Sequence, residues 1–495
     1  MSPATIFKQY TQAACSHVHE RSIRPSIRAE LEAHLEEKAE FLQHSGLSAE
    51  AAARRAVQEM GSADELGGRL AQAYRPASLT VYAAVVLLYA CLGFSAMFLV
   101  NRGITGGGVG LLPQPFALSP GHLAVRAAVS FGVIFISWGL ACFLNYGLLL
   151  RRAFGAALLG LSLALAAALL SLLPGSASVS IAHWLFSFGY FVLCLLSAYV
   201  KGGRWSLPIL WGGGLLLCAG YAAFTQHAGA LTLFLLTLCL VSLLAFLKRK
   251  AAFSLKGVTA LALPALLLCA ALLFGPAAAH GAPAAASVGY WSPGYNSTLS
   301  RQLLSHASLR GPAQFSAEEY RRLILQRYDL QSYQTLFQNG PHTPAYQSYQ
   351  AERDALLDAP SHQYLQNLLP EHVQQDYLFL YIALRYGLVP AGVLVCAMGL
   401  LLFFLLIRAA TCHQPTAFYL ATGCASFLLL QFLLYCLENL GLAPGLSTGL
   451  PFVSWGRASL SASLGELFVL FSCLRFDFSI DEIEYLAPLP NKVKG

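Results

Sequence analysis

Residues 369–385 read LPEHVQQDYLFLYIALR and join a long polar segment to an apolar run. The junction carries one carboxylate, Asp376. An acidic side chain at the edge of a bilayer is partly removed from water and close to lipid headgroups, which favours a functional role. An Asp here also suits a helix N-terminus, where it caps N–H groups without taking part in chemistry. The spacing alone leaves both interpretations open.

The composition around this stretch is that of a membrane protein. The chain has 495 residues, of which 56% are hydrophobic and 11% charged, and its mean hydropathy is +0.57. A soluble domain carries about a quarter charged residues, so the sequence predicts an all-α, polytopic membrane protein. The net charge of +7 would suggest a nucleic-acid ligand in a soluble protein. In a membrane protein topology decides where cations lie, so no nucleic-acid partner is expected.

Apolar runs of about 20 residues, the length that crosses a bilayer, predict about ten transmembrane helices. They lie at 79–100, 123–149, 153–173, 184–200, 205–223, 230–247, 257–279, 377–407, 416–437 and 457–474. Arg and Lys gather on alternate connections, at 151–152, 201–204 and 248–250. Because positive charge marks the cytoplasmic side, both termini are predicted to be cytoplasmic and Asp376 extracytoplasmic.

The predicted spans divide the chain into five parts. These are a cytosolic three-helix module at 1–76, spans 1–7 at 77–280, a large extracytoplasmic loop at 281–376, spans 8–10 at 377–476 and a cytosolic tail at 477–495. In the loop, Ser316 and Glu319 have the spacing of a capping box and predict a helix start. Ten of the twelve cysteines lie in apolar spans and none in this loop, which indicates buried thiols and no disulfide framework.

The N-terminal module has clear helix punctuation. Pro25 suits a first helical turn, and Gly46 and Gly61 suit C-terminal caps. Ser48 and Ser62 suit the N-caps of a second and a third helix. The stretch ELEAHLEEKAEFLQHSGLSAEAAARRAVQEMGSADEL resembles the small helical prefix domains ahead of some bacterial permeases and signalling membrane proteins. That resemblance implies a regulatory or interaction role, and a solvated helical appendage is the alternative.

Glu466 is the one carboxylate near the middle of a predicted span, in SASLGELFVL. An ionised carboxylate there costs about 2.5–3.5 kcal/mol on insertion scales, so it should be protonated, paired or facing a hydrated cavity. This residue supports a transporter or lipid flippase as one possible function. No metal site is predicted, because His372 and Asp376 supply only two ligands.

Two C-terminal stretches resemble the SEDS family, the FtsW/RodA/SpoVE type of bacterial cell-wall polymerase. In the first, residues 369–371 match the family's LPE, residues 376–379 match DFIF, and Gly387 matches a final Gly. The second is ENLGLAPGLSTGLPFVSWGRASL at 438–460, which resembles the signature N-x-G, P-x-T-G, PLPFVSYGGSSL. A ten-span body with a large outer loop between spans 7 and 8 also fits the family.

The resemblance implies a glycosyltransferase of the bacterial cytoplasmic membrane that polymerises lipid II into undecaprenyl-pyrophosphate-linked glycan strands. It implies a class B penicillin-binding protein as partner and Asp376 as the catalytic residue, with Glu371 assisting. The leaving pyrophosphate needs cations, either Arg385 and Arg457 or a divalent metal, Mg or Mn. The remaining substrate-binding residues implied by the second motif are Ser454, Gly456, Pro451 and Asn439.

The chain departs from the family pattern near the predicted site. The family's paired acids become Leu384 and Arg385, and the second Gly of SYGG becomes Arg457. These changes make the site more positive, which suits pyrophosphate binding but also suits a relative that no longer polymerises. A catalytically inactive member that binds a lipid-linked precursor or regulates a partner is therefore the alternative function.

Overall fold

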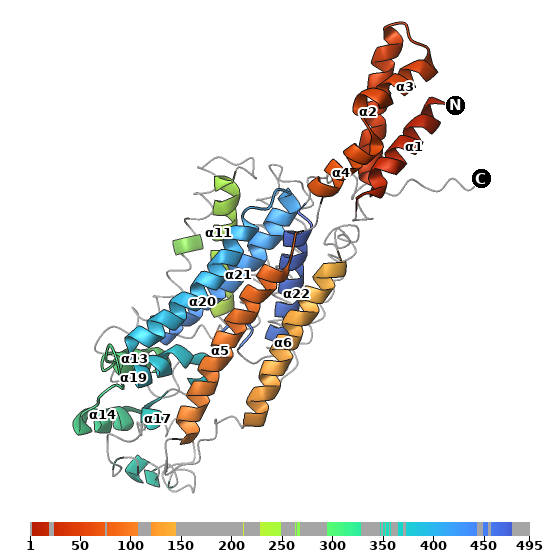
Figure 1. Ribbon diagram of the computed structural model, residues 1–495. Coiled ribbons are helices and arrows are strands. Elements are labelled where there is room, and N and C mark those ends of the chain that lie inside the picture. The colour runs from red at the N-terminus through yellow and green to blue at the C-terminus, as the bar shows by residue number, and fades with distance from the viewer. Residues whose placement is uncertain are drawn as a thin grey trace, which may run out of the picture.

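The computed structural model is helical in every regular element that it describes (Figure 1). It describes residues 2–18, 24–74, 77–106, 120–144, 211, 228–248, 263, 265–267, 295–327, 347, 350–351, 353–355, 357, 365–369, 373–442, 449–453 and 457–477. Four helices among these residues are long and apolar enough to cross a membrane. The chain is therefore an all-helical, polytopic membrane protein, as its composition predicts.

The described spans run alongside one another as a bundle (Figure 1). The four long apolar helices are α5 (Thr80–Gly106), α6 (Pro120–Phe143), α20 (Leu388–Ala409) and α21 (Pro415–Asn439). The neighbouring helices α11 (Ala228–Leu247) and α22 (Arg457–Arg475) pack against α21, and α22 also packs along α6. The spans predicted at 153–173, 184–200, 205–223 and 257–279 lie outside the described residues, apart from isolated positions.

Smaller helices lie at the two ends of this bundle (Figure 1). At one end stand α1 (Pro3–Ser16), α2 (Arg24–His44), α3 (Ala49–Met60) and α4 (Ala63–Ala73). At the opposite end lie α13 (Tyr295–Leu304), α14 (Ala317–Arg327), α17 (Leu365–Leu368), α18 (Val373–Asp376) and α19 (Leu378–Tyr386). The predicted outer loop and the start of the predicted eighth span therefore meet at the end of the bundle away from the N-terminal module.

The three helices predicted from the punctuation of the N-terminal module are present as α2, α3 and α4, and a fourth helix, α1, precedes them. The predicted caps are confirmed, since Ser48 Oγ accepts from Ala51 N–H (3.4 Å) and Ser62 Oγ accepts from Glu65 N–H (3.1 Å). The missed helix is α1, which begins without a side-chain cap and has no acidic residue in its first turn. It supplies buried aromatic rings, Phe7 among them, to a core otherwise built largely of alanines.

The capping box predicted in the outer loop is confirmed at the start of α14. Ser316 N–H donates to Glu319 Oε2 (3.0 Å), and Glu319 N–H donates to Ser316 Oγ (3.2 Å). The backbone and hydroxyl donors of Ser316 hold the pKa of the Glu319 carboxyl below its usual range. This part of the loop therefore has local structure of its own.

The span predicted as one helix over 377–407 is broken at Gly387, where φ is +104°. Residues 308–313, which we call the outer strap, lie across the break. Four backbone hydrogen bonds join them to it: Gly311 N–H to Tyr386 O (2.9 Å), Ala313 N–H to Leu384 O (2.7 Å), Leu388 N–H to Ser308 O (2.9 Å) and Val389 N–H to Leu309 O (3.1 Å). These bonds satisfy polar groups that a helix break would otherwise leave open, and they fix the outer loop to the bundle.

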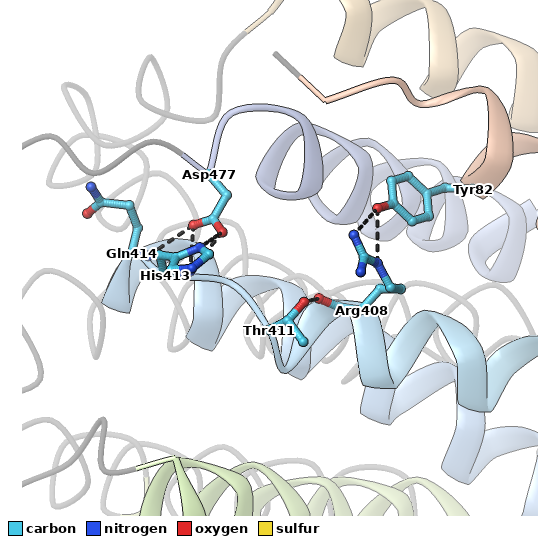
Figure 2. Close-up of polar contacts among 6 residues, drawn as sticks. All are labelled: Tyr82, Arg408, Thr411, His413, Gln414 and Asp477. Carbon is cyan, nitrogen blue, oxygen red and sulfur yellow. Dashed lines mark hydrogen bonds and ion pairs between the residues drawn. The ribbon is translucent and has the colours of Figure 1, made fainter. Parts of the chain in front are cut away.

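At the other end of the bundle, Asp477 ties the end of α22 to the start of α21 (Figure 2). Its carboxylate accepts from the backbone N–H groups of His413 (2.7 and 2.8 Å) and Gln414 (2.9 Å). Nearby, the Arg408 guanidinium donates to the Tyr82 hydroxyl (3.0 and 3.2 Å), joining α20 to α5. These contacts connect α20 with α5 and the end of α22 with the start of α21 at this end of the bundle.

We expect Gly387→Ala to destabilise the protein by about 1–3 kcal/mol. An added Cβ would be placed 2.6–2.7 Å from the backbone of Leu309 and Arg310, in a left-handed conformation that side chains rarely adopt. The midpoint of thermal unfolding in detergent should fall. Gly392→Ala on α20 is the matched control, because nothing lies within 4 Å of its added Cβ. Equal midpoints for the two variants would contradict the proposed role of the break.

Candidate active site

Asp376 lies at the junction of two short helices. It is the last residue of α18 and precedes Tyr377, the N-cap residue of α19. Its side chain is half-buried, whereas residues 378–384 of α19 are all buried. The first seven residues of this nine-residue helix are enclosed by protein, and Asp376 lies just before its N-terminal end.

The first N–H groups of α19 are satisfied by α21. The Asn439 Oδ1 atom accepts from the N–H groups of Phe379 and Leu380, each at 3.1 Å. The Leu378 N–H donates to the Tyr435 hydroxyl at 3.2 Å. Capping of α19 therefore comes from a neighbouring helix, and the interpretation of Asp376 as its N-cap does not hold.

The Nδ2 group of Asn439 binds the backbone just before α19. It donates to the carbonyl oxygen of Asp376 and to that of Tyr435, both at 2.9 Å. All four hydrogen-bonding positions of this buried side chain are thus used on backbone groups. We assign Asn439 a positioning role, and its predicted contact with substrate stays a prediction.

A second carboxylate, missed in the sequence, contacts Tyr377, the residue that follows Asp376. Glu438 precedes Asn439 and is buried, and it forms a hydrogen bond with the Tyr377 hydroxyl. Asp376 and Glu438 both act electrostatically on the phenols of Tyr377 and Tyr435. The signal that could have revealed it is a charged residue at the end of an apolar span.

Edge-to-face aromatic contacts connect α19 with the segment 449–453, which carries Pro451. The Tyr89 ring of α5 makes edge contacts with Phe452 and Phe432, with centroids 6.0 and 6.1 Å apart. Phe432 in turn contacts Phe379 of α19 at 6.0 Å. Phe452 has φ of +60°, so the segment makes a tight turn, and Pro451 is buried in it. The two motif regions of the sequence therefore share one packed aromatic core.

The structure does not bring Arg385 to Asp376. Arg385 is exposed near the C-terminal end of α19, about 10 Å along the helix axis from Leu378, the first residue of α19, at 1.5 Å per residue. Arg457 begins α22. Glu466 lies half-buried in the middle of that helix. Three further predicted site residues lie outside the described residues: Glu371, Ser454 and Gly456.

Comparison with known proteins identifies this part of the chain. Residues 360–477 match the FtsW/RodA/SpoVE family, described as cell cycle proteins. This region matches the SEDS family. The SEDS match includes α18 to α22, and hence Asp376, Glu438, Asn439 and Pro451. The sequence motifs that suggested the family are thus confirmed over the part of the chain that holds the candidate site.

Two other comparisons complete this result. Among curated proteins, no sequence matches the chain. One solved structure, reported under the heading "Structural coordination of polymerization and crosslinking by a peptidoglycan synthase complex", is similar to 80% of this chain and to 98% of its own. The sequence identity is 18% and the TM-score 0.44.

We expect Asn439→Ala to destabilise the SEDS region, because it leaves two buried N–H groups and two carbonyls without their partner. Each unsatisfied buried group costs about 1–3 kcal/mol before relaxation. The measurement is thermal unfolding combined with hydrogen exchange of residues 376–386, which should become faster. Thr411→Ala is the control, since its hydroxyl bonds only to the Arg408 carbonyl within its own turn (2.7 Å). Unchanged exchange in Asn439→Ala would refute this role.

Proposed function

We propose that this protein is a membrane glycosyltransferase that polymerises lipid II into peptidoglycan glycan strands outside the bacterial cytoplasmic membrane. The observation that carries the proposal is the position of Asp376 just before α19, a short and largely enclosed helix that we call the half-helix. Both lie within the region that matches the SEDS family. Asn439 and Tyr435 hold that half-helix through its backbone. A general base must be held in a fixed geometry, which these bonds provide.

Asp376 acts as the base in a glycosyl transfer. The hydroxyl of the acceptor sugar attacks the anomeric carbon of the other chain, forming the new C–O bond. The bond from that carbon to the pyrophosphate oxygen breaks, and undecaprenyl pyrophosphate leaves with the electron pair. The hydroxyl proton passes to the Asp376 carboxylate. A carboxylate near the headgroup plane suits this step, because the pyrophosphate of a lipid-linked sugar lies at the same depth.

The departing pyrophosphate is balanced by positive charge. Arg457, at the start of α22, is the nearer of the two predicted arginines to the aromatic turn at 449–453 in sequence. Arg385 then contacts a more distant part of the glycan or the lipid headgroups. A divalent ion, Mg²⁺ or Mn²⁺, is the alternative counter-charge. Mg²⁺ is commonly bound by one or two carboxylates together with substrate phosphates, and Asp376 supplies such a carboxylate.

The other residues and partners of the reaction follow from the family. Glu371 assists Asp376, and Ser454, Gly456 and Pro451 bind the substrate around the turn that precedes α22. A class B penicillin-binding protein crosslinks the strands that this protein makes. Both termini lie in the cytoplasm, which puts α13, α14 and Asp376 on the outer side with the substrate.

We expect Asp376→Asn to lower glycan polymerisation by at least about 100-fold, since general-base catalysis contributes about 10²–10⁴. The assay is gel electrophoresis of products from labelled lipid II, with and without a co-expressed class B penicillin-binding protein. The control is Asp354→Asn, an exposed carboxylate of the outer loop paired with its neighbour Arg353. It should retain full activity.

Two outcomes of this assay would overturn the proposal. Full polymerisation by Asp376→Asn would remove the base from the mechanism. A wild-type protein that binds lipid II but makes no glycan with any partner would indicate an inactive member that binds precursor or regulates a partner.

A further inference from the structure

Glu438 occupies a position that is costly for a carboxylate. It is 3% exposed and is the penultimate residue of α21, where the negative end of the helix dipole opposes a negative charge. A buried charge without compensation costs several kcal/mol. The contacts of the Glu438 side chain offset part of this cost, and they lead to Tyr377, the residue after Asp376.

The carboxylate takes part in a hydrogen-bond chain across three helices. The Tyr377 hydroxyl donates to Glu438 and accepts from the Asn296 amide of α13. A further bond fixes α13 to the end of α21, since Arg301 Nη2 donates to the Gly441 carbonyl at 2.7 Å. The Tyr377 hydroxyl therefore lies between α13 and α21, and the Arg301 hydrogen bond joins these two helices.

The chain acts on the residue next to the catalytic carboxylate. Tyr377 has φ of −125° and ψ of 37°, so the junction between α18 and α19 leaves helical geometry at this residue. Such a junction can rotate unless side chains hold it. Two neighbouring residues of α21 bind this junction. Glu438 bonds to the Tyr377 hydroxyl, and Asn439 bonds to the Asp376 carbonyl.

We propose that Glu438 and Tyr377 are positioning residues for Asp376. The hydrogen bond between the Tyr377 hydroxyl and Glu438 fixes the rotation of the junction, so that the Asp376 carboxylate faces the hydroxyl of the acceptor sugar. This inference rests on the proposed function of Asp376 as the base. It assigns Glu438 the role of hydrogen-bond acceptor, with no proton transfer to substrate.

The test compares kcat and KM for lipid II in four variants: Tyr377→Phe, Glu438→Leu, Glu438→Gln and the double variant Tyr377→Phe/Glu438→Leu. We expect each of the first two to lower kcat about tenfold or more with KM unchanged, because misorientation of a reacting group affects the chemical step. The double variant should be no worse than either single one, because both remove the same bond. Glu438→Gln should recover most of the kcat lost in Glu438→Leu, since its amide oxygen still accepts from Tyr377.

The matched control for the tyrosine is Tyr386→Phe, which removes an exposed hydroxyl at the far end of α19 and should leave kcat unchanged. Additive losses in the double variant would overturn the inference. So would a Glu438→Gln variant as slow as Glu438→Leu, because that result would assign the effect to the charge of Glu438.

A second readout separates this inference from the proposed function. Hydrogen exchange of residues 373–386 should become faster in Tyr377→Phe and Glu438→Leu, and it should return toward the wild-type rate in Glu438→Gln. If the wild type makes no glycan but exchange follows this pattern, the catalytic function fails and the positioning contact stands. If exchange is unchanged in all variants, the positioning contact is refuted whatever the activity.

Discussion

The amide of Asn439 is the interaction on which the outer end of the bundle depends. It donates to the Asp376 carbonyl and accepts from the N–H groups of Phe379 and Leu380. In the hydrocarbon region a short helix cannot leave its first N–H groups open, because no water reaches them. One buried side chain from α21 therefore makes a short helix possible there, and with it a fixed carboxylate at the end of the bundle away from the N-terminal module.

At the C-terminal end of α19, backbone polar groups also need hydrogen-bond partners, and here another backbone segment supplies them. The break at Gly387 opens carbonyls of α19 and N–H groups of α20, and the outer strap bonds to both sets. An outer-loop segment thus serves as part of the membrane domain. Since α13 also bonds to the end of α21 through Arg301, the outer loop and the site form one connected unit.

The positions of the charged side chains near Asp376 differ from the family's sequence pattern. Leu384 stands where the family has an acid, and in this fold it is fully buried in α19. Arg385 follows it, exposed at the far end from Asp376. A different carboxylate, Glu438 of α21, contacts Tyr377 next to Asp376. A carboxylate near Asp376 in the fold is therefore supplied by another helix.

The sequence by itself determined the membrane class, the helix caps at Ser48, Ser62 and Ser316, and the candidate base, because composition, local capping and short motifs act over a few residues. It missed α1, although Ser2 and Pro3 stand at the N-cap and first helical positions there. It also joined α19 and α20 into one span, since hydropathy does not register a break that stays apolar. Only the tertiary structure decided what Asn439 and Glu438 do. Their partners lie about 60 residues away in the chain, and hydrogen bonds over that separation exist only once α19 and α21 are packed together.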